Sequence, residues 1–164
     1  AYKKLLNSTD NSINIIKTAA VTSQSSGIYA NTLVINAGSI HGIVEDLAVV
    51  NEKGLVGKII STNKNNSKVI LINDQNSSIP VKTISNKFYA IIKGSTDGKY
   101  LTSSFIKDDK KPKVGDLLLT SGNTNTYPKN ILVGKVIKVN QDNFFAIPFV
   151  DLKNLSFVQV IDIK

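Results

Sequence analysis

The chain has 164 residues, 41% of them apolar, with a mean hydropathy of +0.00, which is ordinary for a soluble folded protein. It contains no run of about 18 apolar residues, so no membrane span is predicted within it. The absence of Cys excludes disulfides, thiolate metal sites and cysteine nucleophiles. The chain also lacks Met, which predicts a fragment or a processed form, with any membrane anchor upstream of Ala1.

Basic residues outnumber acidic residues by 20 to 12, and the formal net charge is +8. Such an excess can indicate binding to nucleic acid or to another anionic surface. Every basic residue is Lys, however, whereas the planar forks that read guanine and clamp phosphate belong to Arg. The lysines are also spread along the chain, so we expect no nucleic-acid partner.

Residues 1–14 differ from the rest of the chain. Tyr2, Leu5 and Leu6 recur at helical spacing, and the polar run 7–12 then breaks the pattern. This predicts the end of a helix followed by a polar linker. Because short isolated helices are marginal in water, we expect this one to continue upstream.

From about Ile15 onward, short runs rich in Val and Ile alternate with Gly, Asn, Asp and Ser, which is typical of strands and turns. No interior stretch shows a sustained helical period. Many short strands with frequent turns predict an all-β fold built of barrels or sandwiches. The predicted strands are 17–21, 32–36, 47–50, 55–61, 68–72, 79–83, 88–93, 100–105, 116–120, 131–139, 144–150 and 156–163.

Two segments of the chain resemble each other. Residues 54–63 read GLVGKIISTN and residues 131–140 read ILVGKVIKVN, a shift of 77 positions. A repeat at this distance indicates two related small β-barrels in tandem, the alternative being two hairpins that share turn chemistry by chance. We expect one barrel at 15–84 and another at 85–164, with strand exchange between them left open.

Gly57 and Gly134 occupy matching positions in this repeat. A Gly inside a strand pattern marks a bulge, a bend or a close backbone approach. A small barrel needs such kinks to turn its corners. We therefore expect both glycines to serve backbone geometry rather than chemistry.

Few residues are available for catalysis. His41 is the only His and sits in a Gly-flanked turn, while Ser121 is the most protease-like serine. A triad of these two with Asp74 or Asp116 is the hydrolase alternative, because triad members converge in space from distant positions. No nucleophile elbow or acidic-glycine context surrounds Ser121, so we expect no catalytic residue.

No metal or cofactor site is expected either. Without Cys and with one His, the remaining metal ligands are carboxylates, which are scattered along the chain. The glycine-containing segment 94–98 lacks the Gly-Lys-Ser/Thr ending of a phosphate-binding loop. We interpret it as a hairpin loop.

The most aromatic segment contains Phe144, Phe145 and Phe149. Adjacent strand residues face opposite sides, so we expect one ring of the Phe144–Phe145 pair in the core and the other at a partner-binding surface. Tyr127 and Phe149 would extend that surface into a patch. The alternative is that both rings of the pair pack in the core, which a bulge would allow.

Taken in order, these motifs resemble the MreC family over nearly the whole chain. The segment 31–43 is similar to the family's opening barrel motif. Tyr127 is a departure, since Phe is expected before that Pro, but an aromatic ring is kept. The other matching segments are 54–57, 69–74, 79–81, 114–116, 120–122, 127–128 and 133–136.

The resemblance implies a non-catalytic scaffold of the cell-elongation machinery, which maintains cell shape by organising peptidoglycan synthesis. It implies an N-terminal membrane helix, a dimerising coiled coil that ends at Leu5-Leu6, and two β-barrels on the periplasmic side of the membrane. The first barrel would be similar to the chymotrypsin type without its catalytic residues. Implied partners are a penicillin-binding transpeptidase, MreD, RodA, RodZ, MreB through the membrane complex, and a second copy of the chain. A chymotrypsin-like serine hydrolase is the alternative function.

Overall fold

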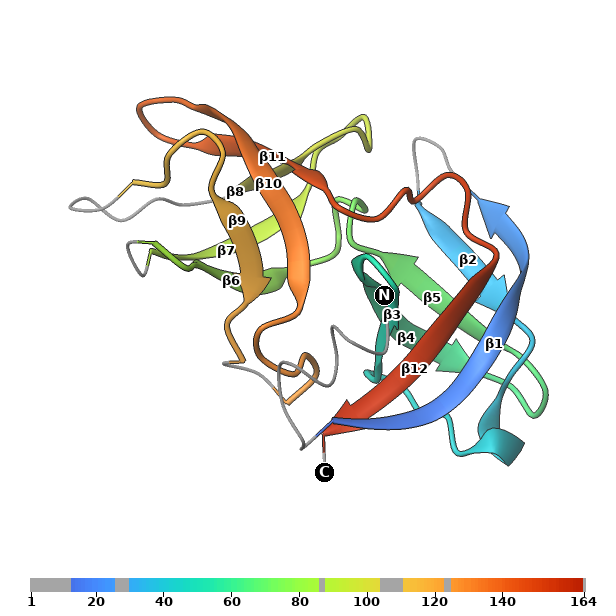
Figure 1. The fold of residues 1–164 in the computed structure, drawn as a ribbon. Coiled ribbons are helices and arrows are strands. Elements are labelled where there is room, and N and C mark those ends of the chain that lie inside the picture. Colours follow the sequence, from blue (N-terminus) through green and yellow to red (C-terminus); the bar gives the residue numbers. More distant parts are fainter. Residues whose placement is uncertain (1–12, 26–29, 86–87, 104–110, 123–124, 164) are drawn as a thin grey trace.

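The computed structural model describes residues 13–25, 30–85, 88–103, 111–122 and 125–163. These residues form twelve β-strands and one short 3-10 helix, η1 (Ser39–His41), arranged as two closed barrels of six strands each (Figure 1). The prediction of an all-β fold with two small barrels is confirmed. The helix end predicted around Leu5 lies outside the described residues, and the likeness of the first barrel to the chymotrypsin type stays a prediction.

The first barrel is antiparallel throughout, with its interior filled by Ile, Leu and Val side chains. In its fifth strand Ser67, Val69 and Leu71 point inward, and the residues between them are more exposed, as the two-residue period of a strand requires. Around the barrel, the strands are β1 (Ile13–Ser25), β12 (Phe157–Ile163), β3 (Ala48–Asn51), β4 (Gly54–Thr62), β5 (Ser67–Leu71) and β2 (Thr32–Ile35).

The second barrel is also antiparallel, and its core includes an aromatic pair. The rings of Phe88 and Phe144 meet edge to face, with their centroids 5.9 Å apart, and both side chains are buried. Around the barrel, the strands are β10 (Leu132–Val139), β11 (Phe144–Pro148), β8 (Leu101–Ser103), β7 (Tyr89–Gly94), β6 (Ile79–Thr83) and β9 (Leu117–Thr120).

The two barrels have the same connectivity. The first runs β3-β4-β5-β2-β1-β12 around its wall, and the second runs β9-β10-β11-β8-β7-β6. Strand β12 therefore occupies in the first barrel the position that β6 occupies in the second. If β1–β6 and β7–β12 are the two repeats, the sixth strand of each repeat is part of the other barrel. The predicted boundary at residue 84 therefore does not separate the two barrels. Strand β6 lies before this boundary but pairs in the second barrel, and β12 lies after it but closes the first.

The repeated glycines also occupy equivalent places in the two sheets. In the pairing of β4 with β3, Val56 is an extra residue just before Gly57; in the pairing of β10 with β9, Val133 is the extra residue just before Gly134. These bulges bend each long strand so that it can pair on both sides of a tight barrel. The matching bulges support an origin of the two barrels in one repeated unit.

Space at both glycines is closed by the neighbouring strand. A Cβ at Gly57 would lie 1.9 Å from the carbonyl oxygen of Ile70, and one at Gly134 would lie 2.6 Å from that of Ile147. These oxygens belong to backbone, which cannot move aside as a flexible side chain does. The close approach of two strands at each bulge therefore requires the absence of a side chain.

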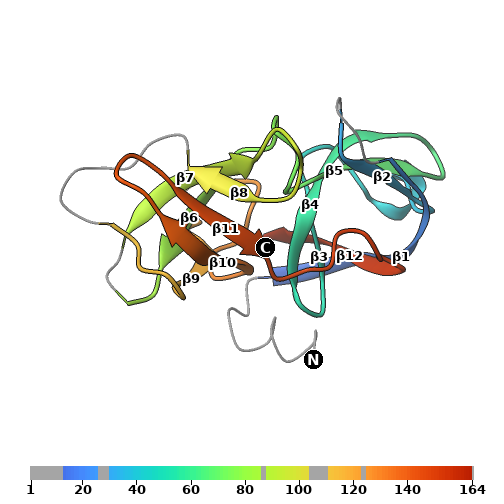
Figure 2. The ribbon, with the colours of Figure 1, turned by 90° about the horizontal axis from the view of Figure 1, so that it is seen from above.

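The barrels lie side by side, with β4 nearest the second barrel (Figure 2). The start of β4 contacts the start of β10, where Gly54 lies against the carbonyl group of Leu132. Two connections cross between the barrels, one from β5 to β6 and one from β11 to β12. None of the helical residues in the described ranges forms a segment long and apolar enough to span a membrane.

Asp74, in the first of these connections, bonds to both barrels. Its carboxylate accepts hydrogen bonds from the backbone N–H of Asn31 at 2.6 Å and of Asn76 at 2.8 Å. Its own carbonyl oxygen accepts a hydrogen bond from the backbone N–H of Gly94, at the end of β7, at 3.1 Å. Because Asp74 is only 2% exposed, these bonds form away from water and hold the entry to β2 against the second barrel.

We predict that Gly57→Val and Gly134→Val each lower the free energy of unfolding by roughly 1–3 kcal/mol, because a side chain there forces two paired strands apart. Lys68→Val, on the exposed face of β5, is the control and should leave stability close to wild type. Chemical denaturation of the three variants measures the effect. Wild-type stability of both glycine variants would show that the close approach is not needed.

We predict that Asp74→Ala lowers the free energy of unfolding by about 2–4 kcal/mol, because it leaves the buried backbone N–H of Asn31 and the partly buried N–H of Asn76 without their acceptor. Asp74→Asn keeps one carbonyl oxygen at the site and should lose less. Thermal and urea unfolding compare the two variants. Equal stability of Asp74→Ala and wild type would contradict the role of this carboxylate as the joint between the barrels.

Candidate partner-binding surface

Phe144 and Phe145 begin β11 and point to opposite sides of the barrel wall. Phe144 is fully buried in the core, whereas Phe145 is half-buried at the outer surface. The Phe145 ring packs edge to face against Tyr100, with their centroids 6.0 Å apart. Tyr100 is itself 37% exposed, so the two rings form an aromatic pair that is open to solvent. An exposed pair of this kind is a candidate binding site because aromatic side chains are enriched at binding hot spots.

Tyr127 does not extend this surface, which corrects the expectation from the sequence. Its side chain is 3% exposed, and burial raises the pKa of its phenol above the usual value. The reason lies in the following loop. The buried hydroxyl of Thr120 donates a hydrogen bond to the carbonyl oxygen of Pro128 at 2.5 Å and so holds the loop over the barrel end.

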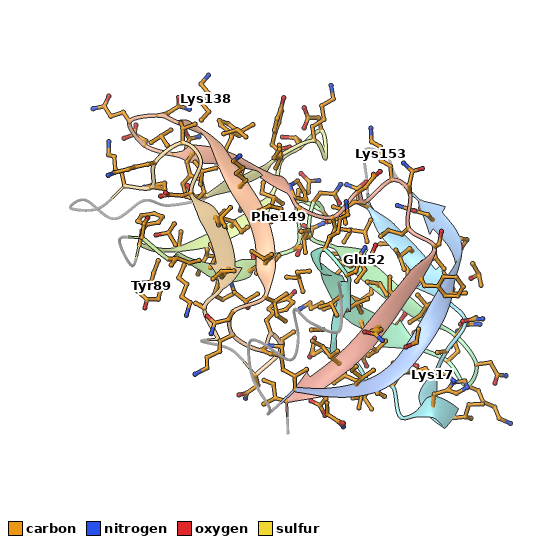
Figure 3. All side chains as sticks on the ribbon, in the orientation of Figure 1. Lys17, Glu52, Tyr89, Lys138, Phe149 and Lys153 are labelled. Carbon is orange, nitrogen blue, oxygen red and sulfur yellow. The ribbon has the colours of Figure 1, made fainter. Side chains whose placement is uncertain are left out.

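Phe149 is half-buried and lies at a different place from Phe145. It follows β11, where the chain leaves the second barrel toward the first (Figure 3). Its backbone N–H donates a hydrogen bond to the carbonyl oxygen of Val133 at 3.2 Å. Of the four candidate aromatic residues, Phe145 is thus the one that lies on the outer wall of the second barrel.

Lysines flank Phe145 on the same outer surface. Lys93, Thr102, Phe145 and Lys138 are successive pairing partners across β7, β8, β11 and β10. Lys138 lies at the outer end of the second barrel (Figure 3). We name this surface the aromatic–lysine face; its residues are Lys93, Tyr100, Thr102, Lys135, Lys138, Phe145 and Ile147.

A second exposed apolar area lies on β7. Tyr89 and Ile91 are 54% and 52% exposed, and they pair with Lys82 and Pro80 of β6. The sequence interpretation missed this area, although the alternation of residues 89, 91 and 93 on one face of the strand was the signal that could have shown it. Tyr89 lies at the outer edge of the second barrel, away from Lys138 (Figure 3).

The candidate catalytic residues are bonded to backbone groups of their own surroundings. His41, in η1 of the first barrel, accepts a hydrogen bond at Nδ1 from the backbone N–H of Gly38 at 3.0 Å. Asp116 accepts one from the backbone N–H of Lys113 at 2.8 Å. Ser121 follows β9 in the second barrel, and within the described ranges no hydrogen bond links it to His41 or to either aspartate. These bonds give no support to the hydrolase alternative.

A crevice of about 660 Å³ lies between the barrels, and two of its amide side chains donate hydrogen bonds to backbone carbonyl groups, whereas the buried Oδ1 of Asn73 has no hydrogen-bond partner among the described residues. Asn73 donates from Nδ2 to the carbonyl oxygen of Gly98 at 2.9 Å, and Gln24 donates from Nε2 to that of Leu152. The first bond joins the β5–β6 connection to the loop between β7 and β8, and the second joins β1 to the β11–β12 connection. Among the described residues, no group of three or more His, Asp or Glu side chains is placed to hold a metal ion.

We predict that His41→Ala and Ser121→Ala each leave intact the cell-shape function that the sequence resemblance implies, as measured by complementation. The buried Ser121 hydroxyl has no hydrogen-bond partner among the described residues, so its removal should cost little stability. His41→Ala removes one acceptor at a partly exposed turn and should cost about 1 kcal/mol or less. The measurement is the cell shape of a deletion strain that carries each variant at wild-type abundance. Loss of rod shape with a folded, abundant variant would reveal a functional site at that residue.

The fold and the surface define a class of protein: two joined six-stranded β-barrels with exposed aromatic and basic side chains on an outer sheet face. Residues 21–162 match the family described as "Rod shape-determining protein MreC, barrel core". The chain belongs to the MreC family, which confirms the resemblance found in the sequence. The family is one of shape-determining structural proteins.

Relatives and solved structures agree with this assignment. The chain is 33% identical over 163 residues to the cell shape-determining protein MreC of Haemophilus influenzae, covering 96% of this chain and 46% of that protein. It thus spans about half the length of that curated relative. A solved MreC structure of Listeria monocytogenes matches with a TM-score of 0.81 at 26% identity, covering 98% of this chain and 83% of that chain.

A further structural match is a complex between Penicillin-Binding Protein (PBP2) and MreC from Helicobacter pylori. Its TM-score is 0.69 at 19% identity, and it covers 93% of this chain and 99% of that chain. At this identity the match concerns the fold alone.

Proposed function

We propose that the chain is a non-catalytic scaffold region of the cell-elongation machinery, which maintains cell shape by organising the proteins that synthesise peptidoglycan. Membership of the shape-determining family supports this function. The structural observation that supports this function is the exposed pair of rings Phe145 and Tyr100, which forms an apolar contact point on a closed barrel. A scaffold needs such fixed surfaces, because preorganised contacts bind with less loss of conformational freedom.

In this proposal the barrels work on the periplasmic side of the cytoplasmic membrane. An N-terminal membrane helix anchors them, and a coiled coil pairs two copies of the protein. Support comes from a match, at 22% identity, to a structure described as the major periplasmic domain of the cell shape-determining filament MreC.

A penicillin-binding transpeptidase is the proposed main partner, and the Helicobacter pylori complex supports this choice. Phe145 is the proposed anchor of the contact. Its neighbour Phe144 packs in the core, so the backbone of β11 holds the outer ring at a defined place. MreD, RodA, RodZ and MreB, through the membrane complex, are further partners that the family resemblance implies.

We predict that Phe145→Ser weakens transpeptidase binding at least tenfold, about 1.4 kcal/mol, with little change in thermal stability. Phe144→Ser should instead lower the free energy of unfolding by about 3–5 kcal/mol, because it removes a fully buried ring. Titration calorimetry and thermal unfolding of both variants separate the two roles.

The matched control is Phe157→Ser, which removes a ring that is 65% exposed on the first barrel. This variant should stay folded and bind the transpeptidase as wild type does. If Phe145→Ser stays folded and also binds normally, the contact lies elsewhere, and the exposed area at Tyr89 and Ile91 becomes the next candidate.

A further inference from the structure

The row of outward residues through Phe145 has a defined order. Lys93 is on β7, Thr102 on β8, Phe145 on β11 and Lys138 on β10, each paired with the next. Neighbouring strands lie about 4.8 Å apart, so the row spans roughly 14 Å of the barrel wall. A ring therefore lies between two cations on one surface.

These lysines are available to a partner. Lys93, Lys135 and Lys138 are all exposed. The ion pair found within the described ranges is Lys58–Asp46, at 3.6 Å, on the first barrel. The cations of the aromatic–lysine face are thus not neutralised by a carboxylate of the described chain, and they flank an apolar contact point at Phe145 and Ile147.

Such an arrangement favours a partner with the opposite charge. Complementary charges around an apolar contact accelerate encounter and align the two surfaces, whereas like charges there are repulsive. Lys side chains also lay their apolar stems along neighbouring rings while keeping the ammonium group in water, so the cations and the ring can contact one partner together.

We propose that the aromatic–lysine face docks an acidic surface of the transpeptidase, one in which carboxylates surround an apolar side chain that contacts Phe145. This inference rests on the proposed function and adds the chemistry of the partner surface. The lysines steer and orient the complex, and the ring supplies the short-range contact.

The test is the association rate constant between the chain and the purified extracytoplasmic domain of the penicillin-binding transpeptidase from the same organism. Lys93→Glu combined with Lys138→Glu should lower this rate constant at least fivefold in about 50 mM salt. In about 0.5 M salt, where charges are screened beyond roughly 4 Å, the double variant should approach wild type.

The control is Lys64→Glu combined with Lys68→Glu, two exposed lysines of the first barrel. It makes the same change in net charge and should alter the rate constant less than twofold. An equal decrease in both double variants would mean that net charge alone acts, and would overturn the proposal.

Other outcomes separate this inference from the proposed function. If Phe145→Ser weakens binding but the Lys93 and Lys138 double variant does not, the transpeptidase partner stands and the acidic surface is refuted. If the wild-type chain does not bind the transpeptidase, the proposed partner and this inference both fail. The chain could instead bind phosphatidylglycerol vesicles as tightly as it binds the transpeptidase, with the same loss in the Lys93 and Lys138 double variant. That result would assign the face to an anionic membrane and overturn the proposal.

Discussion

The structure depends on the exchange of the sixth strands, β6 and β12, between the two barrels. Each six-stranded wall closes only because a strand from the other repeat pairs on both of its sides. A closed barrel leaves none of the described strands with an open edge, so unwanted edge pairing with other chains is avoided. The exchange also makes the two barrels one unit, because neither is complete without chain that passes through the other.

The close contact between the barrels follows from this exchange. Two connections must cross from one wall to the other, and the first of them carries the buried Asp74 carboxylate. This carboxylate accepts a hydrogen bond from the backbone N–H of Asn31, and the carbonyl oxygen of Asp74 accepts one from the backbone N–H of Gly94. Together the two bonds hold the crossing point in one geometry. Buried polar contacts therefore help to set how the outer faces of the two barrels are placed relative to each other, which would suit the proposed scaffold.

Surface and core are also coupled within the second barrel. The ring of Phe144 fills the core against Phe88, and this fixes the strand that carries Phe145 on the other side. The bulge beside Lys138 brings that lysine into register with Phe145. The position of the outer face is thus a consequence of the packing inside, and a change in the core would also shift Phe145.

The local pattern of the sequence determined the secondary structure of this protein and the side of each strand that faces the core. It specified the strands, the Gly57 and Gly134 repeat, and the opposite facing of Phe144 and Phe145, because alternation and turn chemistry act between near neighbours. Which barrel each sixth strand joins was decided by the tertiary structure alone. Because β6 and β12 occupy equivalent positions in the two barrels, the local pattern of either strand fits both barrels. The tertiary structure also decided the burial of Tyr127 and the alignment of Lys93 and Lys138 with Phe145. These depend on loop hydrogen bonds and on strand register between segments far apart in the chain, which local pattern does not encode.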